Sequence, residues 1–269
     1  MKLRKLFYSL FLAASAIVFN GCKEDVIQSC TDSIQNGLEV GVDCGGSCPE
    51  CFICGTDTVM DVDGNVYKSV QIGDKCLLAE NLRVERYRNG DFISAGLSNI
   101  AWSFTTSGAT AFYEELASNK AIYGLLYNWY TVVDPRGLCP IGWHVPTDAE
   151  WTEIIKLLDP STCDTCEGSY HSRLAGGDMK ATGNLIAGTG LWQDPNVDAT
   201  NSSGFSAIPG GFRNEVGDFY AQGVLGYYWS SSESTTSIGR NRGFNYTSGY
   251  AFRSQSFKRT GFSVRGVQD

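Results

Sequence analysis

The stretch YGLLYNWYTVVDPRGLCPIGWHVPTDAEWTEIIKLL, residues 123–158, decides the fold, and its second half predicts an amphipathic helix. Thr147 and Glu150 have the spacing of a capping box, in which each side chain satisfies a backbone N–H of the first helical turn. Pro146 precedes the cap, and Asp159-Pro160 ends the helix. The apolar residues that recur at helical spacing and form its buried face are Trp151, Ile154, Ile155 and Leu158.

The first half of the same stretch predicts a buried element. Residues 124–133 are apolar nearly all round, which is typical of a buried helix or strand, and Asp134-Pro135 closes the segment. A loop that holds Cys139, Trp143 and His144 joins the two halves. We expect these segments to lie at the centre of the hydrophobic core, with His144 as a structural residue that hydrogen-bonds the loop.

Composition favours a loop-rich domain and excludes one class of partner. The 269 residues include 31 glycines and are 42% hydrophobic, which is ordinary for a globular chain. The net charge is −8, and residues 22–269 alone carry −11 because all three charges before them are basic. Nucleic-acid binding requires a basic surface, so we expect no nucleic-acid partner.

The N-terminus predicts export and a lipid anchor. Lys2, Arg4 and Lys5 precede an apolar run too short to span a membrane comfortably, as in a signal peptide over residues 1–21. The run ends at Cys22, in a context that resembles a bacterial lipoprotein processing box. We therefore expect lipidation at Cys22, attachment to the outer membrane through that lipid, a tether over residues 22–29 and exposure at the cell surface. The Lys23-Glu24-Asp25 that follows resembles the surface-export signal of Bacteroidota lipoproteins.

An exported chain is expected to hold its cysteines as disulfides. Cys22 apart, nine remain, so one must be unpaired or must pair between chains. Residues 30–54 form a cysteine-rich spacer that resembles those between anchor and domain in Bacteroidota surface proteins. Its cysteine spacing also suits iron–sulfur or zinc ligation, but the oxidising compartment favours disulfides, and we expect no metal. The spacer pattern fits Cys30, Cys44, Cys48 and Cys51, and it leaves Cys54 over.

The main domain is expected to span residues 56–269. Residues 58–72 predict a β-hairpin that turns at Asp63-Gly64. A calcium loop is the alternative, but Ile72 occupies the position at which such a loop needs glutamate. We expect residues 76–82 to be buried, residues 86–120 to form loops and short elements, and the chain from 182 onward to form short strands and ordered loops.

A second cysteine pair lies later in this domain. Cys163 and Cys166 have the spacing of a redox motif. They sit in a polar loop rather than at the start of a helix, so we expect them to form a loop disulfide.

Six ordered motifs give the domain a family resemblance. MDVDGNVYKSVQIGDKCLLAENL, YGLLYNWYTVV, CPIGWHVPTDAEW, ATNSSGFSAIPGGFR, GYYWSSS and GFSVRGVQD resemble the Fibrobacter succinogenes major paralogous domain. That family is similar to the C-type-lectin-like and formylglycine-generating-enzyme folds. The resemblance implies an α+β domain with a short twisted antiparallel sheet, two main helices and long ordered loops. The motif residues for which it implies structural roles are Trp143, Pro146, Thr147, Glu150, Trp151, Asn201, Gly210, Arg213, Trp229 and Arg265.

Two departures from the family pattern affect the core and the disulfides. Leu77 and Leu78 replace Trp and Met, a change of volume that a core tolerates. Gly266 replaces a late cysteine, so one cysteine has lost its partner. Cys54, Cys76 and Cys139 then remain in the domain, and the pairing we expect is Cys76–Cys139.

The fold implied by the resemblance favours a non-catalytic binding or adhesion module for an unknown surface glycan or protein. The candidate ligand-binding aromatics are Trp192, Tyr227, Tyr228 and Tyr246, although such residues taken singly are more often core. The calcium-dependent sugar motif of C-type lectins is missing, so we expect no metal and no cofactor.

The alternatives are an enzyme and a structural envelope component. Formylglycine-generating chemistry needs a late cysteine pair that holds copper, and no cysteine follows Cys166. A triad hydrolase needs a histidine, and the chain has only His144 and His171. The adjacent carboxylates Glu114 and Glu115 are expected to be solvated. We therefore predict no catalytic residues.

Overall fold

The computed structural model describes residues 29–166 and 170–269, and the chain divides into one unit that ends at Phe52 and a second unit from Ile53 to Asp269. The predicted signal peptide, Cys22 and nearly all of the predicted tether lie outside the described residues. No helix among those residues is both long and apolar enough to cross a membrane.

The first unit is a cysteine-rich turn structure held by two disulfides. Cys30 bonds to Cys48, and Cys44 bonds to Cys51. These are the four cysteines that the spacer pattern fits, and their oxidation is confirmed. Gly46 has φ +64°, and a Cβ there would lie 2.1 Å from the carbonyl oxygen of Leu38, so only glycine fits this turn. A segment this short has little core and depends on its disulfides.

The second unit contains a five-stranded sheet in the order β1-β2-β3-β13-β6. Its strands are β1 (Thr58–Met60), β2 (Val66–Ile72), β3 (Lys75–Leu78), β13 (Val267–Gln268) and β6 (Trp143–His144). The predicted hairpin at 58–72 is confirmed as the antiparallel pair β1–β2. Its turn is closed by Asp61, whose Oδ1 accepts from the backbone N–H groups of Asp63 and Asn65.

A six-stranded sheet follows the order β7-β12-β11-β10-β8-β9. Its strands are β7 (Tyr170–Ser172), β12 (Ala251–Phe257), β11 (Ile238–Asn245), β10 (Leu225–Thr235), β8 (Gly210–Arg213) and β9 (Phe219–Gln222). The pairs are antiparallel except β10–β8. A further pair joins β4 (Thr110–Ala111) to β5 (Leu126–Tyr127). The α+β class is therefore confirmed, but the expectation of one short antiparallel sheet is wrong.

One helix dominates, where two were expected. The predicted helix is confirmed as α4 (Asp148–Leu158), with the complete capping box of Thr147 and Glu150. The other helical segments among the described residues are at most seven residues long: α1 (Asn99–Phe104), η1 (Tyr113–Glu115), α2 (Ala117–Tyr123), α3 (Trp129–Val132) and α5 (Ala175–Met179). Residues 124–133, which were expected to be one buried helix or strand, instead hold β5 and α3 in succession.

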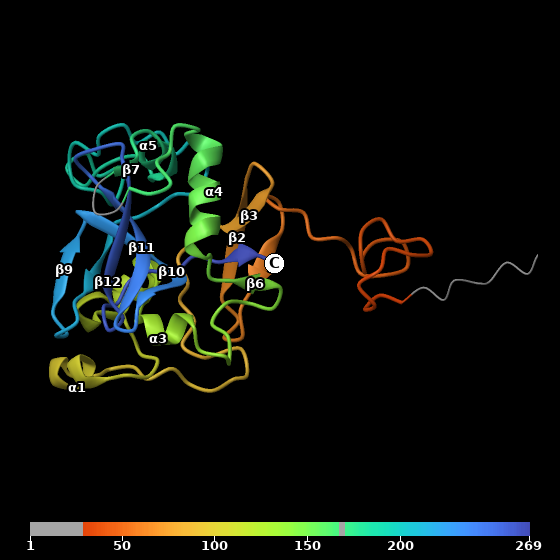
Figure 1. Ribbon diagram of the computed structural model, residues 1–269, viewed down its shortest axis with the longest axis horizontal. Helices are drawn as coiled ribbons and strands as arrows, with labels where there is room; N and C mark the ends of the chain where they lie inside the picture. Colours follow the sequence, from red (N-terminus) through yellow and green to blue (C-terminus); the bar gives the residue numbers. More distant parts are fainter. Residues whose placement is uncertain (1–28, 167–169) are drawn as a thin grey trace, which may run out of the picture. The chain divides into compact units, whose positions relative to one another are not determined.

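The main core lies where α4 meets both large sheets. Figure 1 shows α4 between the strands β10 and β11 on one side and β2 and β3 on the other. Trp151, Ile154 and Ile155 of α4 are fully buried there, as the helical spacing predicts. Side chains from the sheets, α5 and the loops complete the cluster: Ile72, Leu77, Ala175, Met179, Trp192, Phe205, Ala207, Tyr228, Phe244, Ala251 and Val267.

The cysteine pairing in this unit differs from the expected one. Cys76 bonds to Cys54 rather than to Cys139. Cys163 and Cys166 form the expected loop disulfide. Cys139 is the one free cysteine of the described residues; it is buried, and burial raises the pKa of its thiol to about 12. A Cβ built on Gly266 would lie 3.4 Å from Cys139 Sγ, so Cys139 is the cysteine that stands without a partner when residue 266 is glycine.

We therefore expect Gly266→Cys to form a disulfide with Cys139. A bond between residues so far apart in sequence typically stabilises a fold by about 2–4 kcal/mol. Leu78, whose Cδ1 would lie 3.2 Å from the new Cβ, must move slightly. Thiol titration of the unfolded variant should find neither of these two thiols, and Gly266→Ala is the matched control that adds a Cβ without sulfur. Two titratable thiols in the oxidised variant would contradict the pairing.

Candidate ligand-binding groove

The four aromatic residues proposed for ligand binding lie in different environments. Trp192 and Tyr228 are fully buried in the main core, so the proposal that they bind a ligand is wrong. Tyr246 is half-buried and packs against the same core. Tyr227 is also half-buried, but it lines a surface groove. Because side chains alternate along a strand, Tyr227 and Tyr228 lie on opposite faces of the sheet.

The groove has a volume of about 410 Å³ and lies on the six-stranded sheet. This volume is in the range of ligand sites, roughly 300–1,000 Å³. Its lining comes from β8, β10, β11 and β12 and from the loops after β8 and β12: Phe212, Glu215, Tyr227, Ile238, Ser254, Gln255, Ser256, Phe257, Thr260 and Phe262.

An aromatic cluster forms one part of this lining. The ring of Tyr227 lies 4.8 Å from that of Phe262 and 5.9 Å from that of Phe212, between centroids. Gly243, the cross-strand neighbour of Tyr227, leaves space for the ring, because a Cβ there would lie 2.6 Å from Tyr227 Cε1. Phe257, at the end of β12, is 46% exposed and gives the groove an accessible aromatic surface.

Hydroxyl groups form another part of the lining. Ser254 and Ser256 are two residues apart on β12, so both side chains lie on one face of the strand. Asn241 of β11, directly opposite Ser254, donates from Nδ2 to Ser256 Oγ over 3.1 Å. Asn241 is fully buried, and its Oδ1 has no hydrogen-bond partner within the described part of the chain. The groove therefore combines aromatic rings with groups that can bond to hydroxyls.

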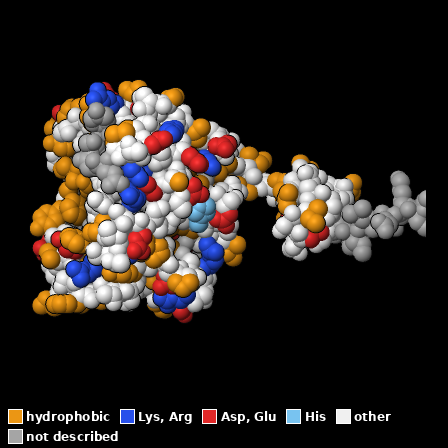
Figure 2. Space-filling model, viewed as in Figure 1, with side chains coloured by type: hydrophobic (Ala, Val, Ile, Leu, Met, Phe, Trp, Pro, Cys, Tyr) orange, Lys and Arg blue, Asp and Glu red, His pale blue; other side chains and the backbone are white. Residues whose placement is uncertain are grey.

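Charge is sparse in the groove. Glu215 is the single charged residue that the described part of the chain contributes to its lining. Lys258 follows Phe257, but its Nζ lies 2.9 Å from Glu233 and 4.2 Å above the Trp129 ring, and only 6% of the residue is exposed. Figure 2 shows acidic and basic side chains interspersed over the visible face of the second unit, with no large area of one sign.

Of the groove's lining, sequence reasoning identified only Tyr227. The missed residues that define its chemistry are Phe212, Glu215, Ser254, Ser256 and Phe257. The alternation of Ser254 and Ser256 in a strand was a readable signal for one polar face. Which partners that face meets depends on strands far apart in the sequence.

The motif arginines that the resemblance assigned to structure are buried. Arg213 stacks on Trp102, 4.4 Å from Cζ to the ring centroid, and donates to the Leu97 carbonyl. Arg265 donates to Asn81 and to the carbonyls of Leu78, Phe205 and Ser206. These bonds tie loops to the sheets, and neither arginine lines the groove.

Other motif residues tie neighbouring segments together or are buried. Trp229 Nε1 donates to the Tyr127 carbonyl over 2.7 Å, and Asn201 Nδ2 donates to Ser206 Oγ. Trp143, Pro146 and Gly210 are buried.

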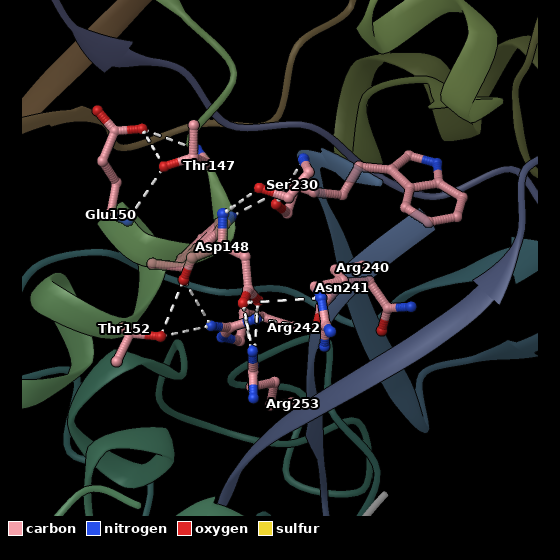
Figure 3. A network of polar contacts seen from close by, with 12 residues as sticks. Thr147, Asp148, Glu150, Thr152, Ser230, Arg240, Asn241, Arg242 and Arg253 are labelled. Carbon is pink, nitrogen blue, oxygen red and sulfur yellow. Dashed lines mark hydrogen bonds and ion pairs between the residues drawn. The ribbon is translucent and has the colours of Figure 1, made fainter. Parts of the chain in front are cut away.

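Asp148 at the start of α4 is the centre of a buried ionic cluster (Figure 3). Its carboxylate lies 2.6 Å from Arg242 and 2.5 Å from Arg253, with Arg240 at 3.9 Å. Burial would raise the pKa of Asp148, but the bonds and charges of Arg253 and Arg242 lower it to about 2. Burial lowers the pKa of Arg242 to about 10, although Asp148 opposes that shift. The cluster joins α4 to β11 and β12.

Neither histidine is placed as a proton shuttle for the groove. The ring nitrogens of His144 lie 2.6 Å from Asp269 and 2.9 Å from Glu150, so both are occupied by carboxylates. Burial would lower the pKa of His144, but these two hydrogen bonds raise it. His171 is 1% exposed, and burial together with the nearby charge of Arg242 lowers its pKa to about 4. Neither residue lines the groove.

An antiparallel five-stranded sheet and a mixed six-stranded sheet, both packed on one capped helix, define an α+β domain with disulfides and an open groove. Residues 70–268 match the model of the Fibrobacter succinogenes major domain, and the chain belongs to that family. Searches of curated proteins and of solved structures found no match.

Proposed function

We propose that this protein is a non-catalytic binding module that holds an extracellular ligand in the groove on the six-stranded sheet. The observation that carries the proposal is the groove itself, an open site with accessible aromatic surface and hydroxyl groups on a rigid sheet. A C-type-lectin-like presentation of loops on such a base is part of this proposal. Rigid strands hold side chains more precisely than loops do, which favours recognition at this place.

The chemistry of the lining supports binding over catalysis. Glycoside hydrolysis typically uses two carboxyl groups, whereas residues 29–166 and 170–269 contribute one carboxylate, Glu215, to the lining. General acid–base catalysis by histidine needs a ring nitrogen near the substrate, and His144 and His171 both lie elsewhere. Oxidation of formylglycine-generating type has no late cysteine pair to use, because the last cysteine is Cys166.

We further propose that the module is displayed on the outer membrane through a lipid on Cys22. The basic start, the short apolar run and the cysteine at its end support this location. The four disulfides are consistent with an exported chain. A lipid-anchored module with an open groove would hold cells or cargo at a surface.

Gly243→Ala tests the role of the groove without replacing a lining residue. The new methyl must push the Tyr227 ring outward, because the two would otherwise lie 2.6 Å apart. We expect cells that display the full chain to adhere to at least one member of a panel of immobilised extracellular polysaccharides and matrix proteins. The variant should adhere less by at least about tenfold.

Phe104→Ala is the matched control, since Phe104 is 79% exposed on α1 and lies outside the groove. It should adhere like the unmodified chain. Equal adhesion of the Gly243→Ala cells, at equal surface abundance, would rule out the groove as the binding site. Release of a chemically altered ligand, by mass spectrometry, would instead favour the enzyme alternative.

A further inference from the structure

We infer that the ligand of the groove is a neutral saccharide, one of whose rings packs against aromatic side chains of the lining, which include Tyr227 and Phe257. This inference rests on the proposed function and specifies the ligand class for the same site. It follows from the kinds of side chain in the lining, from their placement on the sheet and from the near absence of charge.

The aromatic surface suits the apolar face of a sugar ring. Both Phe257, which is 46% exposed, and Tyr227, whose ring is supported by that of Phe262 at 4.8 Å, line the groove. A pyranose presents C–H groups on its faces and hydroxyls around its edge. An aromatic ring with a negative π face attracts such C–H groups and excludes water from them. A fixed ring also loses little side-chain entropy on binding.

Hydroxyl-bearing side chains share the lining with these rings and can bond to the hydroxyls at the edge of a sugar. Ser256 Oγ accepts a hydrogen bond from buried Asn241, so its own O–H can donate toward the groove. Ser254 lies on the same face of β12, and Glu215 supplies a carboxylate acceptor from the loop after β8. A sugar hydroxyl both donates and accepts, so it can bond to serine and to glutamate within one site.

The charge of the lining argues against acidic sugars and strongly basic peptides. Among the described residues no lysine or arginine lines the groove, so a uronate or a sulfate ester would be desolvated without a cation partner there. Glu215 would repel these anions. A basic peptide would find only one carboxylate to pair with, and the remaining lining is uncharged. A neutral ligand leaves no charge without a partner.

Isothermal titration of the purified full-length chain tests the ligand class. The probes are neutral gluco-, xylo-, manno- and galacto-oligosaccharides, an oligogalacturonate and a lysine-rich peptide. We expect at least one neutral probe to bind, and neither charged probe to bind more tightly than it does. Tyr227→Ala and Phe257→Ala should each weaken that binding by at least about tenfold, whereas Phe104→Ala should leave it unchanged.

Glu215→Gln separates hydrogen bonding from charge. The amide keeps an acceptor oxygen, so binding of the neutral probe should fall by less than about threefold and should not depend on salt. Loss of peptide binding in this variant, with no binding of neutral probes, would overturn the saccharide inference and leave the groove as a peptide site. Undiminished binding in both Tyr227→Ala and Phe257→Ala, with the variants folded by circular dichroism, would overturn both the inference and the proposed function.

Discussion

Trp151→Ala is expected to destabilise the second unit by about 3–5 kcal/mol, the usual cost of truncating a fully buried tryptophan. Trp151 is 0% exposed and packs on Phe205 and Tyr228 at 5.8 and 6.3 Å between ring centroids. Its Nε1 also donates to the Trp229 carbonyl, so the variant leaves a cavity and a buried acceptor without its donor. Domains of this size have free energies of unfolding of about 5–15 kcal/mol, so the substitution removes a large part of that free energy.

Chemical denaturation monitored by circular dichroism measures this loss. Thr147→Ala provides a graded comparison on the same helix, because it removes the cap from the Glu150 N–H without opening the core. That cap is worth about 1 kcal/mol. The two variants should differ by severalfold in destabilisation. If Trp151→Ala unfolded at the same denaturant concentration as Thr147→Ala, α4 would not be the central element of the core.

The helix could be predicted from the sequence because its determinants are local. The capping box of Thr147 and Glu150 and the spacing of Trp151, Ile154 and Ile155 lie within nine consecutive residues. The β1–β2 hairpin was predictable for the same reason, since its turn is built by Asp61 and its near neighbours.

The sheets could not be predicted to the same extent because distant segments build them. β13 has two residues, and Val267 pairs with both Leu77 and His144. Such a short strand carries no periodicity of its own. The Cys54–Cys76 bond was missed because any of three cysteines could pair, and only the fold places Cys139 beside Gly266 instead.

The candidate site also depends on both local sequence and contacts between distant segments. The Gly/Ser-rich segments with aromatic residues indicated which part of the chain holds the groove. They did not indicate which face of the sheet the groove lies on. Tyr227 and Tyr228 are adjacent in sequence, yet one lines the groove and the other is buried in the core. Which of the two tyrosines lines the groove is set by the strand register, which pairs Tyr227 with Gly243 and places the ring over the glycine.

Asp148→Asn should be the second strongly destabilising change, with an expected cost of about 3–5 kcal/mol. The side chain of Arg242 is 0% exposed and that of Arg253 is 11% exposed, and both pair with the carboxylate of Asp148. Asparagine keeps one acceptor oxygen but removes the negative charge, so the fully buried Arg242 loses the carboxylate it pairs with and the half-buried Arg253 loses one of its partners. Asp164→Asn is the control, because its pair with Lys156 is exposed and typically worth about 1 kcal/mol or less.

The pH dependence of unfolding distinguishes this loss of charge from a loss of packing. The pKa of Asp148 falls from its usual 3.8 to about 2 on folding, so its stabilisation is present above pH 3.8 and disappears as the pH falls toward 2. The pKa of His171 falls from about 6.5 to about 4 on folding, so the protein also loses stability as the pH falls from about 6.5 to 4. The unmodified chain should therefore lose stability in both ranges, whereas Asp148→Asn should lose less below pH 3.8, where other carboxyls with lowered pKa, such as Glu150 and Asp159, still contribute. If both chains lost stability equally below pH 3.8, the ionic cluster would not be what holds α4 to β11 and β12.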